Sequence, residues 1–520
     1  MSAVDSCAAP SERLRLSWAR LERLLFWSAF AGAAAMMWLA PRLPMTDVPA
    51  HAAQIALWRD LICGTSRWAG LVYVNLLTPY LIGYGLALPF SFMFSPETAV
   101  RIVLTLAFVG FVTGCIGLRR ALGSNKRLDW LFLPGFFGFD WKYGFLTFLT
   151  AAPVLFAFLI LTLRYARSPS LARGTVVVVA GIALLFSHGL IFLFGGLICG
   201  MLLLGPLHER WTVRLMRMSP AFVLGVVLVL FVIVTSLRGT AAHYDGWRMG
   251  GPMWLRLITA LTFILGTNWN LDPVLAALAA SMIVSPFFLG CRLNVGPPQR
   301  LLAALILVFF ALPAFAFQTG FLYARFALFI LPFFAFQFRQ DDGQAASPAT
   351  AALAQMAMIG FCLATLAIQA SRISAFANES RSFDAVEKAA EPGKRALYLV
   401  FNGNSRPAYN KVAVDHFPDW YQADKHGFVD FNFAVFPPQV VRFRQADIPP
   451  INQTMALHPD TFDWRKNDGW VYRYFFIRGG AHRVDWLKAR SPCRLSLAAA
   501  DPPWFLVRRD SCPAHVDMSH

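Results

Sequence analysis

The chain has 520 residues, of which 57% are hydrophobic and only 14% are charged, and it includes 48 Phe and 16 Trp. This composition excludes an ordinary soluble globular protein of this size. Runs of about 17–25 apolar residues, the length that a helix needs to cross a bilayer, recur from Leu24 to about Ala370 and predict an integral membrane protein.

The net charge of +17 belongs mainly to the first part of the chain. Residues 1–371 hold 26 Lys and Arg against 13 Asp and Glu, whereas residues 372–520 hold 20 against 16. Cations dispersed between apolar runs are typical of cytoplasmic loops, and an anionic lipid ligand is the alternative that stays open. Because they do not cluster on one soluble face, we expect no nucleic-acid partner.

The N-terminal stretch "SERLRLSWARLERLL" contains four Arg residues, which predicts a cytoplasmic start and an uncleaved first anchor. The apolar runs then predict about eleven transmembrane helices, within a range of ten to thirteen. These spans are placed at residues 23–41, 70–93, 99–118, 144–164, 174–188, 190–206, 218–237, 272–290, 301–317, 320–338 and 350–370.

With an odd number of spans, residues 372–520 lie on the side of the membrane opposite the N-terminus, which is the extracytoplasmic side. Two stretches fit this scheme poorly. The basic sequence "LRRALGSNKR" at 118–127 falls on the outer side, against the positive-inside rule. Pro252 and Arg256 make residues 252–268 a better interfacial or re-entrant helix than a span.

The composition changes at residue 372, after which charged residues of both signs are mixed and no long apolar run follows. From residue 396 strand-like and helix-like pieces alternate. We therefore predict an all-α polytopic membrane domain over residues 1–371 and an extracytoplasmic soluble α/β domain over residues 372–520. Cys493 and Cys512 are a possible disulfide if the tail lies outside. The stretch "VDHFPDWYQADKHG" either contacts sugar or is a packed surface helix, with the relevant residues being His416, Asp419, Trp420 and Tyr421.

In this topology the ionisable residues near membrane depth all fall on the outer side. They are Asp47, His51, Asp140, Lys142, His188, Asp245, Arg248 and Arg325. Such residues are costly in a membrane and are candidates for a functional site. Each has a structural alternative: a helix cap at Asp47, a polar break in a helix hairpin at His188, a snorkelling side chain at Arg325, and plain loop positions for the two other Asp residues. The helix "AHAAQIALWRDLI" after Asp47 is expected to lie on the membrane surface.

The pattern resembles the GT-C superfamily of membrane glycosyltransferases, which use sugars linked to polyprenyl phosphates. The resemblance is carried by "TDVPAH" with Asp47, "YGFLTFL" at the start of the fourth span, "SHG" with His188, and "ARFALFILPFF" with Arg325. It covers about the first 370 residues. The first loop has a single Asp with a His four residues later, so it departs from the paired acidic motif of the metal-dependent members. We therefore expect no metal and no other cofactor.

The resemblance implies transfer of a sugar from a polyprenyl-phosphate donor to a glycan, lipid or protein acceptor of a bacterial-type cell envelope, by a multi-pass protein of the inner membrane. Asp47 is then the general base of an inverting enzyme. The other candidates bind substrate or phosphate, where Arg is favoured because its planar fork meets phosphate oxygens in pairs. Two hypotheses from other classes stay open: a transporter or flippase for a lipid-linked glycan, and a non-catalytic assembly subunit.

Overall fold

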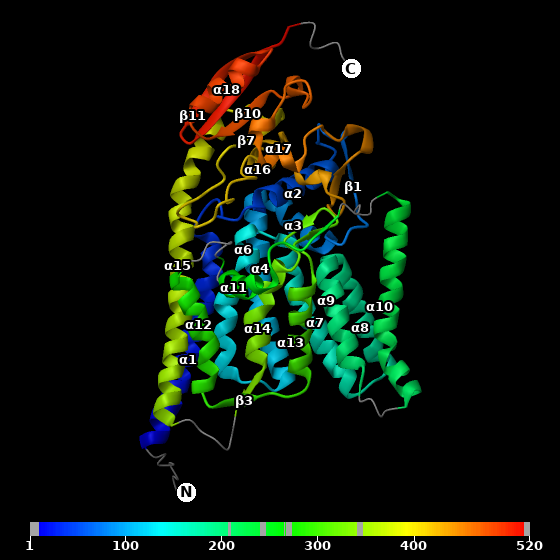
Figure 1. Ribbon diagram of the computed structural model, residues 1–520, viewed down its shortest axis with the longest axis vertical. Helices are drawn as coiled ribbons and strands as arrows, with labels where there is room; N and C mark the ends of the chain where they lie inside the picture. The colour runs from blue at the N-terminus through cyan, green and yellow to red at the C-terminus, as the bar shows by residue number, and fades with distance from the viewer. Residues whose placement is uncertain are drawn as a thin grey trace, which may run out of the picture.

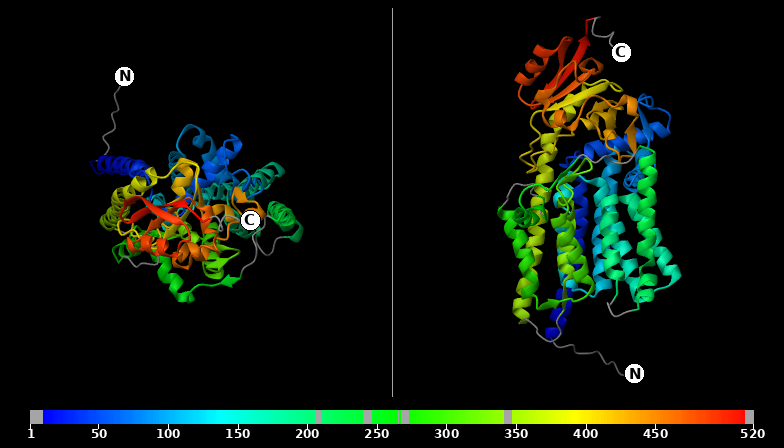
Figure 2. Two further views of the ribbon diagram at one scale, coloured as in Figure 1. Left: turned by 90° about the horizontal axis from the view of Figure 1, so that it is seen from above. Right: turned by 45° about the vertical axis from the view of Figure 1, so that its right-hand side comes forward.

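The computed structural model describes residues 10–205, 210–239, 246–264, 266, 273–340 and 347–513. A bundle of helices forms the lower part of the molecule, and a smaller α/β region covers its upper end (Figure 1). The same two layers are visible after the molecule is turned (Figure 2). Helix α1 (Pro10–Ala35) rises from the lower end, whereas the last strands of the chain lie at the top.

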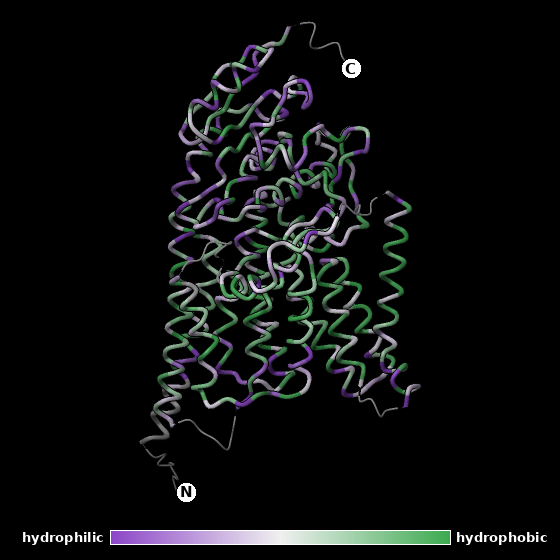
Figure 3. The backbone as a smooth tube through the Cα atoms, viewed as in Figure 1, coloured by the Kyte–Doolittle hydropathy of each residue, from purple (hydrophilic) through white to green (hydrophobic). Residues whose placement is uncertain are grey.

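Apolar helices run along the bundle. Four of the described helices are long and apolar enough to cross a membrane: α4 (Pro96–Leu122), α7 (Leu146–Arg167), α10 (Trp211–Leu237) and α15 (Pro348–Lys388). Shorter apolar helices complete the bundle: α8 (Leu171–Ser187), α9 (Gly189–Leu203), α12 (Pro273–Phe288), α13 (Pro297–Ala311) and α14 (Ile330–Phe336). Hydrophobic residues prevail along these helices, and hydrophilic ones gather in the loops at the lower end (Figure 3). The chain is a membrane protein, as its composition predicts.

Local sequence signals set the ends of these helices. At α4 the Ser95 hydroxyl accepts a hydrogen bond from the backbone amide of Thr98, and Pro96 occupies the first turn. Gly123 ends the helix with a left-handed φ of 70°, a conformation that favours glycine. Helix α15 begins with the same Ser-Pro pair. The spans predicted at 99–118 and 350–370 therefore lie within longer helices.

The run predicted as a span over residues 70–93 is not a single helix. It contains strand β1 (Val72–Val74), a turn and the short helix α3 (Leu81–Met93). Strand β1 pairs with β9 (Val441–Phe443) of the C-terminal part, so its apolar residues are covered by protein rather than lipid. The prediction was wrong because hydropathy does not distinguish these two kinds of burial.

Helix α2 (Val48–Ile62) follows the first loop and was expected on the membrane surface. In the structure almost all of its side chains are buried, including the polar His51 and Gln54. The helix packs against α3, α4 and helix α16 (Asp419–Lys425) of the C-terminal part. It is therefore a buried element between the bundle and the tail.

Residues 124–143 run from the lower end of the bundle to its upper end in short helical pieces, which are η2 (Lys126–Leu131), α5 (Phe132–Gly135) and α6 (Phe139–Tyr143). At the lower end the Asn125 amide donates to the carbonyl of Phe338 at 2.8 Å. At the upper end the Lys142 ammonium donates to the carbonyl of Tyr409 in the tail at 2.8 Å. This passage was not among the predicted spans, because Pro134, Gly135 and Gly138 interrupt it. Because residues 124–143 cross the bundle, the basic stretch 118–127 lies at the lower end together with the other basic loops. The conflict of this stretch with the positive-inside rule is thereby removed.

Helix α11 (Met253–Ile264) lies across the upper end of the bundle (Figures 1 and 2). That the segment 252–268 lies at a membrane interface stays a prediction. The guanidinium of Arg256 is buried and donates to carbonyl oxygens at the C-terminal end of α13, among them Phe309 at 2.8 Å and Leu312 at 2.8 Å. A cation at the C-terminus of a helix is stabilised by the helix dipole. A small three-stranded sheet combines β2 (Trp247–Arg248), which precedes α11, with the hairpin of β4 (Phe315–Ala316) and β5 (Thr319–Gly320), which follows α13. The elements η3 (Ala324–Phe329) and α14 come after this hairpin.

Helix α15 joins the bundle to the tail and rises along one edge of the molecule (Figure 1). The domain boundary predicted at residue 371 lies inside it, since the helix continues to Lys388. Phe383 on this extension packs against Phe417, Phe476 and Trp504, with ring centroids 5.0–5.7 Å apart. The upper end of α15 is thus part of the core of the tail.

The tail is built on a five-stranded sheet with the order β11-β12-β10-β7-β8. Strand β7 is parallel to β8 and β10, whereas β12 is antiparallel to β10 and β11. The strands are β7 (Arg395–Val400), β8 (Phe428–Asp430), β10 (Tyr474–Arg478), β11 (Arg494–Asp501) and β12 (Trp504–Ser511), and the helices include α16, α17 (Gln453–Leu457) and α18 (His482–Arg490). Two further short strands, β3 (Cys291–Leu293) and β6 (Phe338–Gln340), pair at the lower end of the bundle. The predicted combination of a helical membrane part and a C-terminal α/β part is confirmed.

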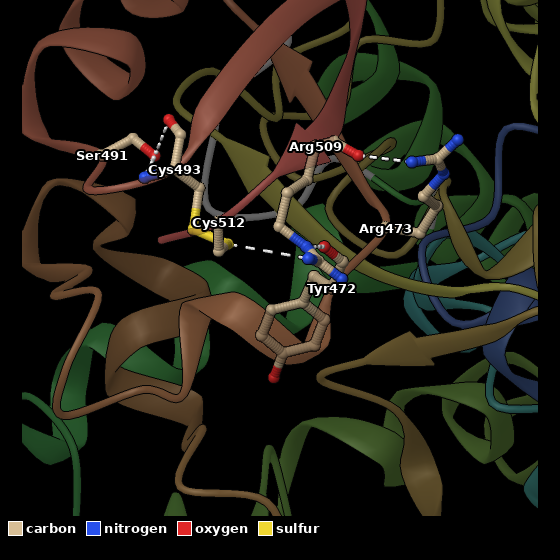
Figure 4. Close-up of a disulfide and its surroundings, with 6 residues drawn as sticks. All are labelled: Tyr472, Arg473, Ser491, Cys493, Arg509 and Cys512. Atoms are coloured by element: carbon tan, nitrogen blue, oxygen red, sulfur yellow. Dashed lines mark hydrogen bonds between the residues drawn. A yellow bond between two sulfur atoms is a disulfide. The ribbon is translucent and has the colours of Figure 1, made fainter. Parts of the chain in front are cut away.

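A disulfide links Cys493 and Cys512 (Figure 4). It connects the residue before β11 with the residue after β12, and therefore closes the open end of this hairpin. The guanidinium of Arg509 lies beside it and donates to the Cys512 sulfur at 3.6 Å. The pair agrees with the possible disulfide noted in the sequence.

The first loop is fastened to the tail through Arg42. Its buried guanidinium lies near four carboxylates, with N–O distances of 2.7 to 3.6 Å, and stacks on the Trp420 ring at 4.5 Å. The carboxylates belong to α4, the upper end of α15 and α16, and they are Glu97, Asp384, Glu387 and Asp424. Burial alone would lower the pKa of Arg42, but these four negative charges raise it above its ordinary value.

Candidate functional site

A cavity of about 250 Å³ lies where the first loop, the upper end of the bundle and the tail meet. Its walls come from segments far apart in the chain: the start of α2, the start of α7, the β4–β5 hairpin with η3, and several loops of the tail. The ionisable and hydrogen-bonding residues that line it include Asp47, His51, Arg325, Tyr398, Asp415 and His416.

Asp47 stands immediately before α2. Its backbone amide donates to the carbonyl of Tyr143 at 2.8 Å, which ties the first loop to the upper end of residues 124–143. Its side chain makes no capping hydrogen bond, although the residue occupies the N-cap position. The carboxylate faces the cavity and is 17% exposed. Burial raises the pKa of Asp47 to about 7, against the opposing effect of Arg325, so this group exchanges a proton near neutral pH.

His51 lies one helical turn further along α2, where its ring meets the Phe433 ring edge-on at 5.2 Å. Its Nδ1 lies 2.7 Å from the hydroxyl of Tyr84, and that hydroxyl donates to the side-chain oxygen of Gln439. Since the Tyr84 proton is used on Gln439, Nδ1 is the donor to Tyr84, and Nε2 carries the lone pair. Burial, together with the charge of Arg325, lowers the pKa of His51 to about 3. His51 is therefore a neutral acceptor.

The tail contributes a second carboxylate and a second imidazole. Burial first, and then the negative charge of Asp47, raise the pKa of Asp415 to about 7. The Nε2 atom of His416 lies 3.9 Å from the nearer carboxylate oxygen of Asp47, and its Nδ1 lies 3.2 Å from the hydroxyl of Tyr398. Burial lowers the pKa of His416 to about 4, so the ring is neutral and its approach to Asp47 is not an ion pair.

Arg325 supplies the positive charge of the cavity. Its guanidinium stacks on the Phe145 ring at 3.7 Å and donates to the carbonyl of Gly320 at 3.3 Å. Within the described part of the chain it forms no ion pair with a carboxylate. An arginine that is held by an aromatic ring and a carbonyl, but not neutralised, has capacity to bind a phosphate.

Three of the predicted site residues lie near this cavity but do not line it. The Lys142 ammonium reaches the Tyr409 carbonyl and joins the bundle to the tail. Asp140 is completely buried within α6. His188 separates α8 from α9, as a polar break in a helix hairpin would, and its Nδ1 accepts a hydrogen bond from the Leu190 amide at 3.2 Å, which caps α9. The side chain is buried, so it does not reach interfacial water as that alternative supposed.

The last two predicted residues lie in the segment after α10. Arg248 is on strand β2, exposed, with its guanidinium 4.1 Å from the centre of the Phe315 ring. It does not line the cavity, although its strand pairs with the hairpin that does. Asp245 lies outside the described residues.

Sequence reasoning missed Asp415 and Tyr398, and gave His416 only as a possible sugar contact. The neighbouring Asp419, Trp420 and Tyr421 are buried in the tail rather than in the cavity. The signal that was available is the pair Asp415-His416, two ionisable residues placed between apolar neighbours and a short helix.

The β4–β5 hairpin forms one wall of the cavity and has a strained turn. Its two turn residues, Phe317 and Gln318, have φ of 52° and 58°, and Phe321 has φ of 59°. A two-residue turn with positive φ at both positions ordinarily contains Asn or Gly, because larger side chains are disfavoured there. Such a strained conformation persists only where the surrounding structure holds the backbone in it. Here this conformation places Phe317 and Phe321 at the cavity.

The chemical capacity of this arrangement follows from its charges. Two carboxyl groups with pKa values near 7 face one space, so one can accept a proton while the other keeps one. Arg325 can balance a developing negative charge in the same space. Neutral histidines and Tyr398 can orient hydroxyl groups.

No protein-family model matches the chain, and no curated protein matches it. Among solved structures, the chain is similar to the single-particle cryo-EM structure of the arabinofuranosyltransferase AftD from mycobacteria. The sequence identity is 13% and the TM-score is 0.47. The similarity covers 94% of this chain but only 40% of the length of that protein.

Proposed function

We propose that this protein is a membrane glycosyltransferase that transfers a sugar from a polyprenyl-phosphate donor to a hydroxyl group of an envelope acceptor. The observation that carries the proposal is the cavity between bundle and tail, in which Asp47, Asp415 and Arg325 come together from distant parts of the chain. A proton acceptor and an unneutralised guanidinium in one cavity suit a reaction that deprotonates a hydroxyl and releases a phosphate.

In this mechanism Asp47 removes the proton from the acceptor hydroxyl as its oxygen attacks the anomeric carbon of the donor sugar. The bond between that carbon and the phosphate oxygen breaks, and the lipid phosphate leaves with the electron pair. Arg325 stabilises the phosphate charge. Attack opposite the leaving group inverts the anomeric carbon. Asp415, the other carboxyl, holds sugar hydroxyls or exchanges its proton with Asp47.

The same proposal includes the sidedness of the protein. Hydrophilic residues gather in the loops at the lower end of the bundle, where the chain carries Arg119, Arg120, Lys126 and Arg127, and the disulfide lies in the tail. We therefore place the lower end in the cytoplasm and the cavity with the tail outside. The donor and the acceptor, whether glycan, lipid or protein, then meet at the outer surface of the inner membrane.

Arg325→Gln tests the phosphate-binding role. We expect it to reduce transfer by about 100-fold, because one group that stabilises developing charge is typically worth that much. The matched control is Arg248→Gln, since both guanidiniums stack on a Phe ring but only Arg325 lines the cavity. Transfer is measured with purified protein, a labelled polyprenyl-phosphate sugar and envelope acceptors. Equal losses in the two variants would contradict the assignment.

The same assay separates the alternatives. A glycosyltransferase releases polyprenyl phosphate in step with the transferred sugar. A flippase moves the donor between leaflets without consuming it, and an assembly subunit does neither. Donor movement without release of polyprenyl phosphate would overturn the proposal.

The pH dependence follows from the two carboxyl groups. Because Asp47 must be ionised to accept a proton, kcat/KM should fall as pH drops below about 7, by about tenfold per pH unit. Two like charges in one cavity repel each other, so Asp415→Asn should move this fall to lower pH. The profile of kcat/KM against pH for both proteins is the measurement. A profile that Asp415→Asn leaves in place would show that the two groups are not coupled.

A further inference from the structure

A second cavity, of about 990 Å³, lies at the other end of the bundle, far from the proposed catalytic site. It is bounded by α1, the C-terminal end of α4, η2 and the start of α15. The bonds at its edges fix these elements together: the Gln355 amide donates to the Glu22 carboxylate at 2.8 Å, and the Arg119 guanidinium meets the Asp129 carboxylate at 2.7 Å.

The charge of this cavity is strongly positive. Both of its lining carboxylates are already engaged, Glu22 by Gln355 and Asp129 by Arg119. Four further cations from three elements line it, and none of them forms an ion pair with any carboxylate among the described residues: Arg23, Arg120, Lys126 and Arg127. Among the described residues, the five cations that line the cavity therefore exceed its two carboxylates by about three positive charges.

The rest of the wall is apolar and aromatic. Phe26, Trp27 and Trp130 line it together with Ile116 and Leu289. Trp27 is 45% exposed, and Leu24 on the same helix is 67% exposed, as suits side chains that meet lipid tails. Tryptophan is typical of the level at which headgroups join hydrocarbon. The cavity is thus lined by cationic and apolar side chains from the same three elements, α1, α4 and η2.

The positive-inside rule explains why cations occur at this end of the bundle, but not why they converge. Other basic residues at the same end, such as Arg164 and Arg173 of the α7–α8 connection, line neither cavity. The helix dipole favours Arg120 in the last turn of α4, but it does not account for Arg23 or Lys126. A shared anionic ligand accounts for all of them.

We propose that this cavity binds the headgroup of an anionic phospholipid from the adjoining membrane leaflet. The phosphodiester would meet the four cations that form no ion pair among the described residues, and the glycerol and upper acyl chains would follow the aromatic side chains toward the bilayer. A membrane lipid is favoured over a soluble phosphate because the cavity has an apolar wall next to exposed membrane-facing side chains. This proposal does not rest on the proposed transferase activity.

The test compares two double variants with the same change of charge, Arg120→Gln with Lys126→Gln in the cavity, and Arg164→Gln with Arg173→Gln outside it. Purified, delipidated protein is titrated with phosphatidylglycerol in phosphatidylcholine nanodiscs, and retained lipid is counted by native mass spectrometry. We expect the cavity variant to retain phosphatidylglycerol about thirtyfold more weakly, since each basic side chain at an anionic surface contributes about 1 kcal/mol. The control variant should retain it like the wild type.

Thermal unfolding in phosphatidylcholine alone shows whether each variant is folded, and Arg127→Gln replaces Lys126→Gln if the first pair does not fold. Equal weakening in the cavity and control variants would overturn the proposal in favour of general surface charge. Displacement of phosphatidylglycerol by millimolar inorganic phosphate would overturn the lipid assignment and leave a site for soluble phosphate. Retention unchanged in both variants would overturn the site itself.

Discussion

Asp47→Asn should reduce sugar transfer by about 10² to 10⁴-fold, the usual contribution of a positioned proton acceptor. Asparagine has the shape of aspartate but cannot take a proton at neutral pH. The folded structure should survive, because the Asp47 side chain makes no capping hydrogen bond that the change would remove. The substitution also removes a negative charge whose burial is unfavourable, as the raised pKa of Asp47 indicates. The measurement is kcat for the labelled donor at saturating acceptor.

The control for this prediction is Asp60→Asn. Asp60 lies on the same helix, where it joins Arg59 at 2.9 Å and His426 of the tail at 2.6 Å, but it does not line the cavity. Loss of this link would loosen the docking of α2 without touching the proton acceptor, so we expect a change in transfer of only a few fold. If Asp60→Asn were as inactive as Asp47→Asn, docking rather than proton transfer would explain both.

The sequence was sufficient to find one half of the candidate site. Asp47 stands out because a carboxylate directly after an apolar run has an unfavourable free energy near the membrane, so such a residue is a candidate for a functional site. This reasoning needs only local sequence information. Asp415 lies in an ordinary soluble domain, where acidic residues are common. Its place opposite Asp47 depends on how the tail packs against α2, which no local pattern encodes.

The same limit explains the errors in the spans. The apolar run at 70–93 contains strand β1, which pairs with a strand of the tail, whereas residues 124–143 cross the bundle although Pro and Gly interrupt their helix. Hydropathy records how apolar a segment is and not what covers it. The regular helices α4, α7 and α10 were predicted well, because each is continuous and apolar and, at least in α4, carries clear capping residues.

Arg42 is the residue on which the docking of the tail should depend most strongly. Its guanidinium lies within 2.7–3.6 Å of four carboxylates contributed by α4, α15 and α16, and its side chain is only 8% exposed. Removing one partner of a buried ionic cluster is far more damaging than removing a surface ion pair, because the remaining charges stay buried and repel one another. The cavity has one wall from the first loop and another from the tail, so this cluster also holds the two carboxyl groups in place.

Arg42→Met should therefore lower the free energy of unfolding by about 3–5 kcal/mol, seen as earlier thermal unfolding and faster proteolysis of the tail in detergent. The deficit should shrink as pH falls, because protonation neutralises the carboxylates that the variant leaves uncompensated; the folded variant binds more protons than the unfolded chain. Arg508→Met is the control, since its partner Asp510 is a surface residue and loss of an exposed ion pair should leave the unfolding temperature almost unchanged. A deficit that did not change with pH would show that Arg42 acts through packing on Trp420 and not through its charge.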